Sequence, residues 1–204
     1  MSATTSAPAD RSDARTVTVG GAQLGGLSAL AVVLFLAASR LLADRAGLAG
    51  GIETLIVLAA GVAVSFLPAQ WSAARHVEGI AGAAALGFVG TLVFTLLDIV
   101  VLRPLKAYPW TWDAIGGGST WWYLPVWWML GTFLAWMGGI VTARQAARGA
   151  ATLGRVAGPT LVATLIAVTV ARGLGLGLTL PVLAGLGWTA VVTLLAVVAL
   201  ARPG

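Results

Sequence analysis

The sequence predicts an all-α fold: a polytopic membrane helical bundle of six transmembrane helices, with both termini in the cytoplasm. The first observation is composition, since 59% of the 204 residues are hydrophobic, only 9% are charged and the mean hydropathy is +0.95. Soluble domains are roughly 45–50% apolar and about 25% charged, and one of this size cannot hide so much apolar surface. The second is that the apolar residues form six runs of membrane-spanning length. Such runs are expected to be helices, because a helix satisfies its backbone hydrogen bonds internally where lipid cannot. The third is that basic residues stand singly between these runs, which is typical of a multi-pass protein of the cell inner or plasma membrane.

Charge and residue usage exclude several classes of function. A net charge of +5 and a pI near 11.1 could suggest a nucleic-acid partner, but the basic residues are scattered rather than gathered in a patch. The chain has no Cys, which excludes disulfides, thiolate metal sites and iron–sulfur ligation. With one His and one Lys it also lacks the residues of a zinc, haem or retinal site. We therefore expect no metal, no cofactor and no nucleic acid.

The N-terminal half predicts a tail and three helices. Residues 1–20 are rich in Ser, Thr, Ala and Pro and lack apolar periodicity, so they predict a disordered cytoplasmic tail before a membrane domain of residues 21–204. The first helix covers about 22–42 and ends before the Gly-rich turn at 47–51. The second covers about 52–67, because Pro68 is expected to stop it. The third covers about 79–102 and ends at Arg103-Pro104, since proline disfavours a helical residue before it.

The C-terminal half predicts three more helices. The fourth covers about 121–142, and Ser119 or Thr120 is its expected N-cap after a run of three glycines. The fifth covers about 156–172 and is short for a bilayer, so Arg172 is expected to snorkel from its end. Alternating glycines at 173, 175 and 177 then supply a turn. The sixth helix covers about 180–200.

Basic residues predict the orientation. With six helices, seven basic residues lie with the termini and five lie on the opposite side. Basic residues in short loops favour the cytoplasm, so both termini are expected inside. The residues on the inner side are Arg11, Arg15, Arg75, Arg144, Arg148, Arg155 and Arg202.

A Trp-rich stretch dominates the middle of the chain. Residues 108–136 hold seven of the nine Trp residues and both Tyr residues. Because Trp and Tyr settle where hydrocarbon meets water, the loop at 103–120 is expected to lie on the extracytoplasmic membrane surface. The candidate aromatic lid consists of Trp110, Trp112, Trp121, Trp122 and Tyr123.

Asp98 is the most informative single residue, because it lies inside the third predicted helix, where a carboxylate usually faces protein or a polar cavity. The same helix presents one row of small or polar residues that ends at Asp98, and the fourth helix has a matching row. The two rows are therefore expected to pack together, with Asp98 pointing inward. They are Gly79, Ala83, Gly87, Thr91 and Thr95 on the third helix, and Gly131, Ala135 and Gly139 on the fourth.

Charged residues at the same depth complete a candidate polar pocket. One interpretation is a site beneath the aromatic lid for a lipid headgroup, a quinone-like ring or a small solute. The other is a set of ion pairs that tie helix ends together beside an ordinary aromatic belt. The candidate pocket residues are Asp98, Arg40, Glu53, Arg103, Lys106 and Arg172.

Three function classes are compatible with this pattern. The favoured one is a non-catalytic subunit of a membrane complex or a module that binds lipid or another hydrophobic ligand. Its partners would be membrane lipids, partner membrane subunits or further copies of the chain. A small-solute transporter or channel component is the first alternative, although the apolar helix middles disfavour it. A membrane enzyme acting on a lipid headgroup, with Asp98 as base and Arg103 or Arg172 holding phosphate, is the second, and it lacks a second catalytic acid or base.

Overall fold

The computed structural model describes the chain except residues 1–9, 106–122, 150 and 202–204. This part is helical, with six helices long and apolar enough to cross a membrane, so the predicted helical membrane bundle is confirmed at that level. The helices are α1 (Ala14–Leu41), α2 (Ala46–Trp71), α3 (Val77–Leu97), α5 (Tyr123–Ala147), α6 (Leu153–Gly173) and α7 (Leu180–Ala201). A π-helical turn, η1 (Asp98–Leu102), extends α3 into one span of 77–102.

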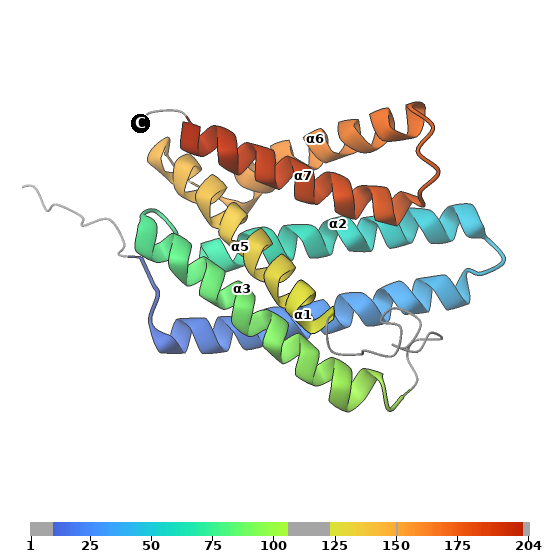
Figure 1. Ribbon diagram of the computed structural model, residues 1–204, viewed down its shortest axis with the longest axis horizontal. Coiled ribbons are helices and arrows are strands. Elements are labelled where there is room, and N and C mark those ends of the chain that lie inside the picture. Colours follow the sequence, from blue (N-terminus) through green and yellow to red (C-terminus); the bar gives the residue numbers. More distant parts are fainter. Residues whose placement is uncertain (1–9, 106–122, 150, 202–204) are drawn as a thin grey trace, which may run out of the picture.

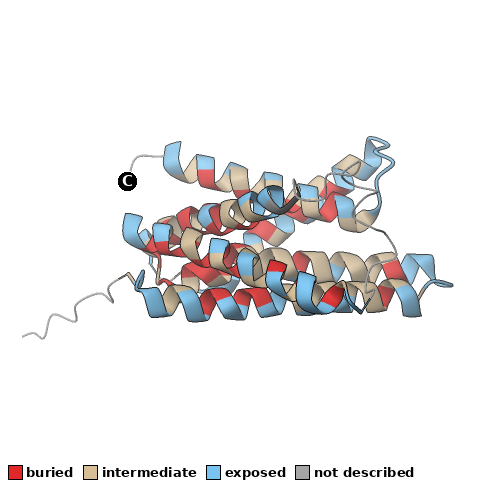
Figure 2. Ribbon diagram, turned by 60° about the horizontal axis from the view of Figure 1, so that its bottom comes forward, coloured by how far each residue is buried: buried red, intermediate tan, exposed pale blue. Residues whose placement is uncertain are grey.

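Successive helices run back and forth along the long axis of the bundle (Figure 1). One end, which we call the α2–α3 end, carries the start of α1, the α2–α3 and α5–α6 connections and the end of α7. The opposite, α1–α2 end carries the α1–α2 and α6–α7 connections and η1. Figure 2 shows both ends exposed, with buried residues on the facing sides of the helices. The chain therefore enters α1 and leaves α7 at the same end.

Two helices, α2 and α5, hold the bundle together. α1 packs against α2 and α3, and α5 packs against both α2 and α3, so these four helices form a ring. α7 packs against α2, α5 and α6 on the other side (Figure 1). Many large apolar side chains face outward, including Leu55, Leu165 and Leu194, as expected for surfaces in contact with lipid.

Small residues set the close approach of α3 and α5, as the sequence predicts. A Cβ placed on Gly87 would lie 2.5 Å from the Cβ of Ala135 and 2.9 Å from the carbonyl oxygen of Gly131. The methyl group of Thr91 occupies the space beside Gly131. The predicted contact between the two rows is confirmed, because only small side chains let these backbones come so near.

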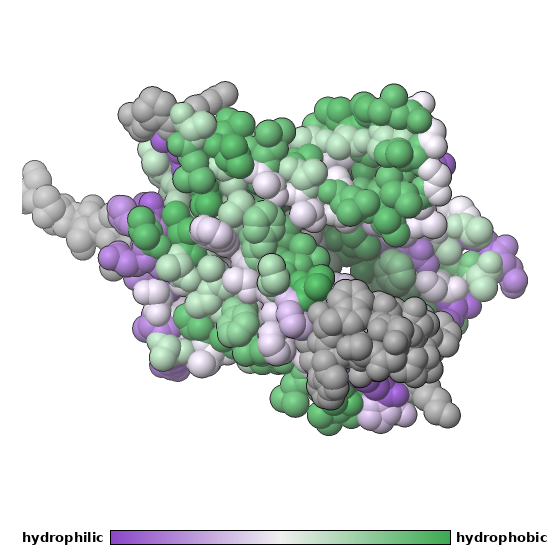
Figure 3. Space-filling view, in the orientation of Figure 1, coloured by the Kyte–Doolittle hydropathy of each residue, from purple (hydrophilic) through white to green (hydrophobic). Residues whose placement is uncertain are grey.

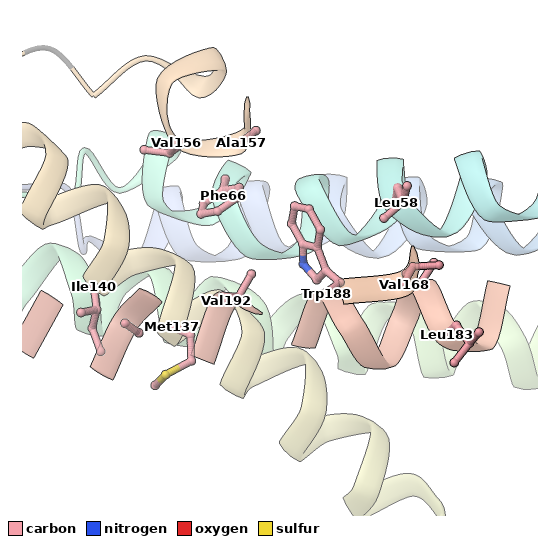
Figure 4. Packing of buried hydrophobic residues seen from close by; sticks show 12 residues of the cluster. Leu58, Phe66, Met137, Ile140, Val156, Ala157, Val168, Leu183, Trp188 and Val192 are labelled. Carbon is pink, nitrogen blue, oxygen red and sulfur yellow. The ribbon is translucent and has the colours of Figure 1, made fainter. Parts of the chain in front are cut away.

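A buried indole anchors α7 to α2 (Figure 4). Trp188 is 2% exposed, and its Nε1–H donates to the Oγ atom of Ser65 at 3.0 Å. Its ring lies edge-on to that of Phe66, with centroids 5.9 Å apart. Gly61 makes room, since a Cβ there would lie 3.0 Å from the indole. Satisfying the indole N–H while burying the ring makes Trp188 the centre of this half of the core.

α1 begins earlier than the sequence predicts. It starts at Ala14 rather than near residue 22, so the predicted disordered tail of residues 1–20 includes a helical part. Asp13 caps the helix, accepting hydrogen bonds from the backbone N–H of Thr16 at 3.0 Å and from its hydroxyl at 2.6 Å. The Thr16 hydroxyl and then its N–H lower the pKa of Asp13. This N-cap begins the helix before the apolar run does.

α2 is also longer than predicted at both ends. The Gly-rich segment 47–51, predicted as a turn, lies in the first turns of the helix, and Pro68, predicted to stop the helix, lies inside its last turn before Trp71. Glycine costs a helix about 1 kcal/mol relative to alanine, and a proline removes one hydrogen bond. In lipid, unpaired backbone groups cost more, so the helix continues through both.

Candidate functional site

Asp98 is buried at the junction of α3 and η1 and is 4% exposed. In η1 the backbone hydrogen bond spans five residues, so the N–H of Arg103 donates to the carbonyl oxygen of Asp98 at 2.9 Å. The wider turn also returns the Arg103 side chain, whose Nε–H donates to Oδ2 of Asp98 at 3.0 Å. Single π-turns are frequently found at functional sites. The turn thus fixes an ion pair at the end of the third span.

One oxygen of this carboxylate is left over. Oδ1 of Asp98 is buried and accepts no hydrogen bond within the described ranges. A buried carboxylate oxygen is costly unless a hydrogen-bond donor reaches it. A buried polar atom of this kind in a native fold calls for an explanation, and an adjacent cavity offers one.

A cavity of about 570 Å³ adjoins Asp98 inside the ring of α1, α2, α3 and α5. It lies in the half of the bundle towards the α1–α2 end, and its walls are almost entirely apolar. Figure 3 shows this half of the molecule hollowed, with hydrophobic residues on the walls in view. The walls come from Ser28, Ala31, Val32, Phe35 and Leu36 of α1, Ile56, Val57, Ala60 and Val64 of α2, Thr91, Phe94, Thr95 and Asp98 of the third span, Trp127, Leu130, Gly131 and Leu134 of α5, and Gly185 of α7.

The hydroxyl groups in these walls already donate hydrogen bonds within their own helices. Ser28, Thr91 and Thr95 each donate to a carbonyl oxygen of their own helix, at 2.9, 2.7 and 2.8 Å. Thr95 also accepts from Nε1–H of Trp128 at 3.2 Å. Asp98 is therefore the wall residue that brings a charge to the cavity, and its Oδ1 atom, itself buried, accepts no hydrogen bond from the described residues.

The predicted polar-pocket residues take different places. Asp98 and Arg103 come together as described, whereas Glu53 accepts a short hydrogen bond from the hydroxyl of Ser39 on α1. Arg40 and Arg172 are exposed at the ends of α1 and α6, and α6 packs mainly against α7. Within residues 10–105 and 151–201, no ion pair joins Arg172 to Asp98 or Glu53. Lys106 lies outside the described residues.

The predicted aromatic lid falls largely outside the description. Trp110, Trp112, Trp121 and Trp122 lie among residues 106–122, and of Tyr123 only the backbone, which begins α5, is described.

The described aromatic residues that line the cavity are instead Phe35, Phe94 and Trp127. Trp128, the neighbour of Trp127, packs edge-on against Phe88 with ring centroids 6.3 Å apart. Sequence reasoning missed Trp127, although it precedes Gly131 by four residues and so shares its helix face.

Comparison with known proteins finds no family model, no curated protein and no solved structure that matches this chain. The elements of the site are a half-open, mostly apolar space, one buried ion pair and one carboxylate oxygen that accepts no hydrogen bond from the described residues. Such a space can hold an apolar molecule and orient it by a single polar contact.

Proposed function

We propose that this multi-pass membrane protein is a non-catalytic module that binds a hydrophobic ligand in the cavity between α1, α2, α3 and α5. The cavity itself carries the proposal. Its volume of about 570 Å³ lies within the range of about 300–1,000 Å³ of small-molecule sites, which are mostly apolar with a few polar groups. The ligand can be a membrane lipid or another hydrophobic molecule drawn from the bilayer.

Charge favours an outer-leaflet position for this site. Six described Arg residues lie towards the α2–α3 end, against four towards the α1–α2 end. Because basic residues in short connections favour the cytoplasm, the α2–α3 end is the cytoplasmic one in this proposal, and the cavity lies in the outer half of the membrane. The first set is Arg11, Arg15, Arg75, Arg144, Arg148 and Arg155, and the second is Arg40, Arg45, Arg103 and Arg172.

Packing below the cavity favours binding over transport. A Cβ on Gly138 of α5 would collide with the carbonyl oxygen of Ser65 on α2, so these helices touch directly towards the α2–α3 end. A Cβ on Gly139 would lie 3.3 Å from the Cβ of Ala83 on α3. Transporters with broken helices bind their substrate near the membrane midplane, where unwound backbone provides polar groups. Below this cavity, by contrast, α2, α3 and α5 are helical and pack closely together.

The test fills the cavity and compares a neighbouring position. Ala60 of α2 lines the cavity, and Ala59, the residue before it, is exposed on the outer surface of the same helix. We expect Ala60→Phe to occupy ligand space and Ala59→Phe to face lipid without effect. Native mass spectrometry of the detergent-purified chain should find a bound apolar molecule on the wild type and on Ala59→Phe. The Ala60→Phe variant should lose most of it.

Thermal unfolding in the same detergent shows that both variants remain folded. A wild type that carries no apolar molecule after purification from membranes, or equal retention by all three proteins, contradicts the proposed site.

A further inference from the structure

We infer that the ligand of this cavity is a single-chain amphiphile with an uncharged hydroxyl head group, which donates a hydrogen bond to Oδ1 of Asp98. The inference rests on the proposed function and adds the chemistry of the ligand. Its starting point is Oδ1 of Asp98, a buried carboxylate oxygen on a residue of the cavity wall that accepts no hydrogen bond from the described residues.

The head group must be a donor. An ionised carboxylate can only accept hydrogen bonds, and Arg103 fills only Oδ2. The Ser28, Thr91 and Thr95 hydroxyls already donate to carbonyl oxygens of their own helices. Because the terminal torsion of an aspartate side chain is soft, a small rotation presents the carboxylate to a donor in the cavity. A ligand O–H there gives Oδ1 a donor.

The head group is uncharged because the ion pair is already balanced. The guanidinium of Arg103 lies 3.0 Å from Oδ2, so Asp98 and Arg103 together carry no net charge. An ammonium group would add an unbalanced charge to an apolar cavity, where desolvation is costly. A carboxylate or phosphate would lie beside the like charge of Asp98. A hydroxyl group makes the hydrogen bond without either cost.

The dimensions fit one chain of moderate length. The walls run from Ser28 to Leu36 on α1 and from Ile56 to Val64 on α2, a rise of about 12 Å at about 1.5 Å per residue. That is close to one leaflet of a hydrocarbon core about 30 Å thick. Asp98 lies on the wall near the α1–α2 end, so the chain extends from there towards the middle of the bundle.

The experiment uses photolabelling of the full chain in phosphatidylcholine nanodiscs. A dodecanol bearing a diazirine on its chain is crosslinked by light, and labelled peptides are mapped by mass spectrometry. Unlabelled 1-dodecanol and its methyl ether, which cannot donate, then compete at equal mole fraction in the bilayer. We expect labels on the cavity walls and about tenfold stronger competition by the alcohol, equivalent to about 1.4 kcal/mol for a hydrogen bond to a charged acceptor.

Two variants locate the preference. The double variant Asp98→Leu with Arg103→Met removes both charges together, which buried ion pairs tolerate far better than the loss of one partner. In it the alcohol and the ether should compete equally. Thr169→Val removes a hydroxyl from the exposed surface of α6, away from the cavity walls, and should keep the preference for the alcohol.

Two results separate this inference from the proposed function. Equal competition by alcohol and ether in the wild type, with labels still on the cavity walls, overturns the donor inference alone. Labels spread over the lipid-facing surface, with no competition by either compound, overturn the proposed site as well.

Discussion

Asp10 fastens the N-terminal segment to the start of α3. Its carboxylate accepts hydrogen bonds from the backbone N–H groups of Arg75, His76 and Gly79 at 3.1, 2.9 and 3.0 Å. The side chain is only 3% exposed, and Nδ1 of His76 lies 3.6 Å away. Since His76, the N-cap of α3, makes no side-chain capping bond, Asp10 caps this helix from another segment.

Removing this cap should destabilise the protein. Asp10→Ala leaves the three N–H groups without their acceptor, and we expect a loss of about 2 kcal/mol in the free energy of unfolding. Asp10→Asn keeps one acceptor oxygen and should lose less. Thermal denaturation in detergent measures both, and Asp44→Ala, at an exposed acid in the α1–α2 connection, is the control. Equal stability of Asp10→Ala and Asp44→Ala would show that the contact contributes nothing.

At the level of residues, the sequence predicts whether a charged side chain is buried better than it predicts which residue that side chain pairs with. Asp98 is expected to point inward because a helical carboxylate within a span needs protein around it, and it is buried. Its partner could not be chosen among the nearby cations, since residues five apart do not share a face of a regular α-helix. Only the π-turn brings Arg103 back onto Asp98. Asp10 was hidden for a similar reason, because its contacts are 65 to 69 residues away.

Among the helices, glycine shows which faces touch. On α1 a Cβ at Gly25 would lie 2.7 Å from Val93 and 2.8 Å from the carbonyl oxygen of Gly90, whereas a Cβ at Gly26 meets nothing within 4 Å. Alanine substitutions at these two adjacent positions therefore distinguish the effect of helix propensity from the effect of helix packing. Gly25→Ala should cost about 1–3 kcal/mol by forcing α1 from α3, as overpacking does.

Gly26→Ala should be neutral or slightly stabilising, because alanine is the better helix former. The measurement is the melting temperature of both variants in one detergent, with circular dichroism confirming that helix content is kept. Similar melting temperatures for the two variants would mean that α1 and α3 do not approach each other at Gly25.

Helix faces were easier to predict than helix ends. The α3–α5 contact could be predicted from small residues spaced by four, because residues at this spacing share a helix face wherever the helix begins or ends. The ends of α1 and α2 depend on the balance between capping, helix propensity and the cost of unpaired backbone groups in lipid, and the pattern of apolar residues does not reveal that balance. Asp13 and Thr16 form a cap inside a stretch whose composition predicts disorder, and lipid keeps the glycines after Ala46 and Pro68 helical.

At the scale of the whole molecule, one half of the bundle is filled and the other is hollow. A cluster of buried apolar residues around Trp188, which includes Phe66 and Met137, joins α2, α5, α6 and α7 (Figure 4). The ring of α1, α2, α3 and α5 is closed by small residues towards the α2–α3 end and contains the cavity towards the α1–α2 end. The sequence predicts six spans from length and apolarity. It cannot predict the cavity, which depends on how far four helices separate beyond their contacts.

The arrangement of the six spans leads to a labelling prediction. The chain has no Cys, so single cysteines can be introduced without background. Ser12 and Arg148 are exposed at the α2–α3 end, and Asp44 and Leu174 at the α1–α2 end. A membrane-impermeant maleimide should therefore label Asp44→Cys and Leu174→Cys on intact cells, and Ser12→Cys and Arg148→Cys only after lysis. Opposite accessibility for Ser12→Cys and Arg148→Cys would contradict the fold. The reverse pattern for both pairs would keep the fold, invert the orientation argued from arginine, and move the cavity to the cytoplasmic leaflet.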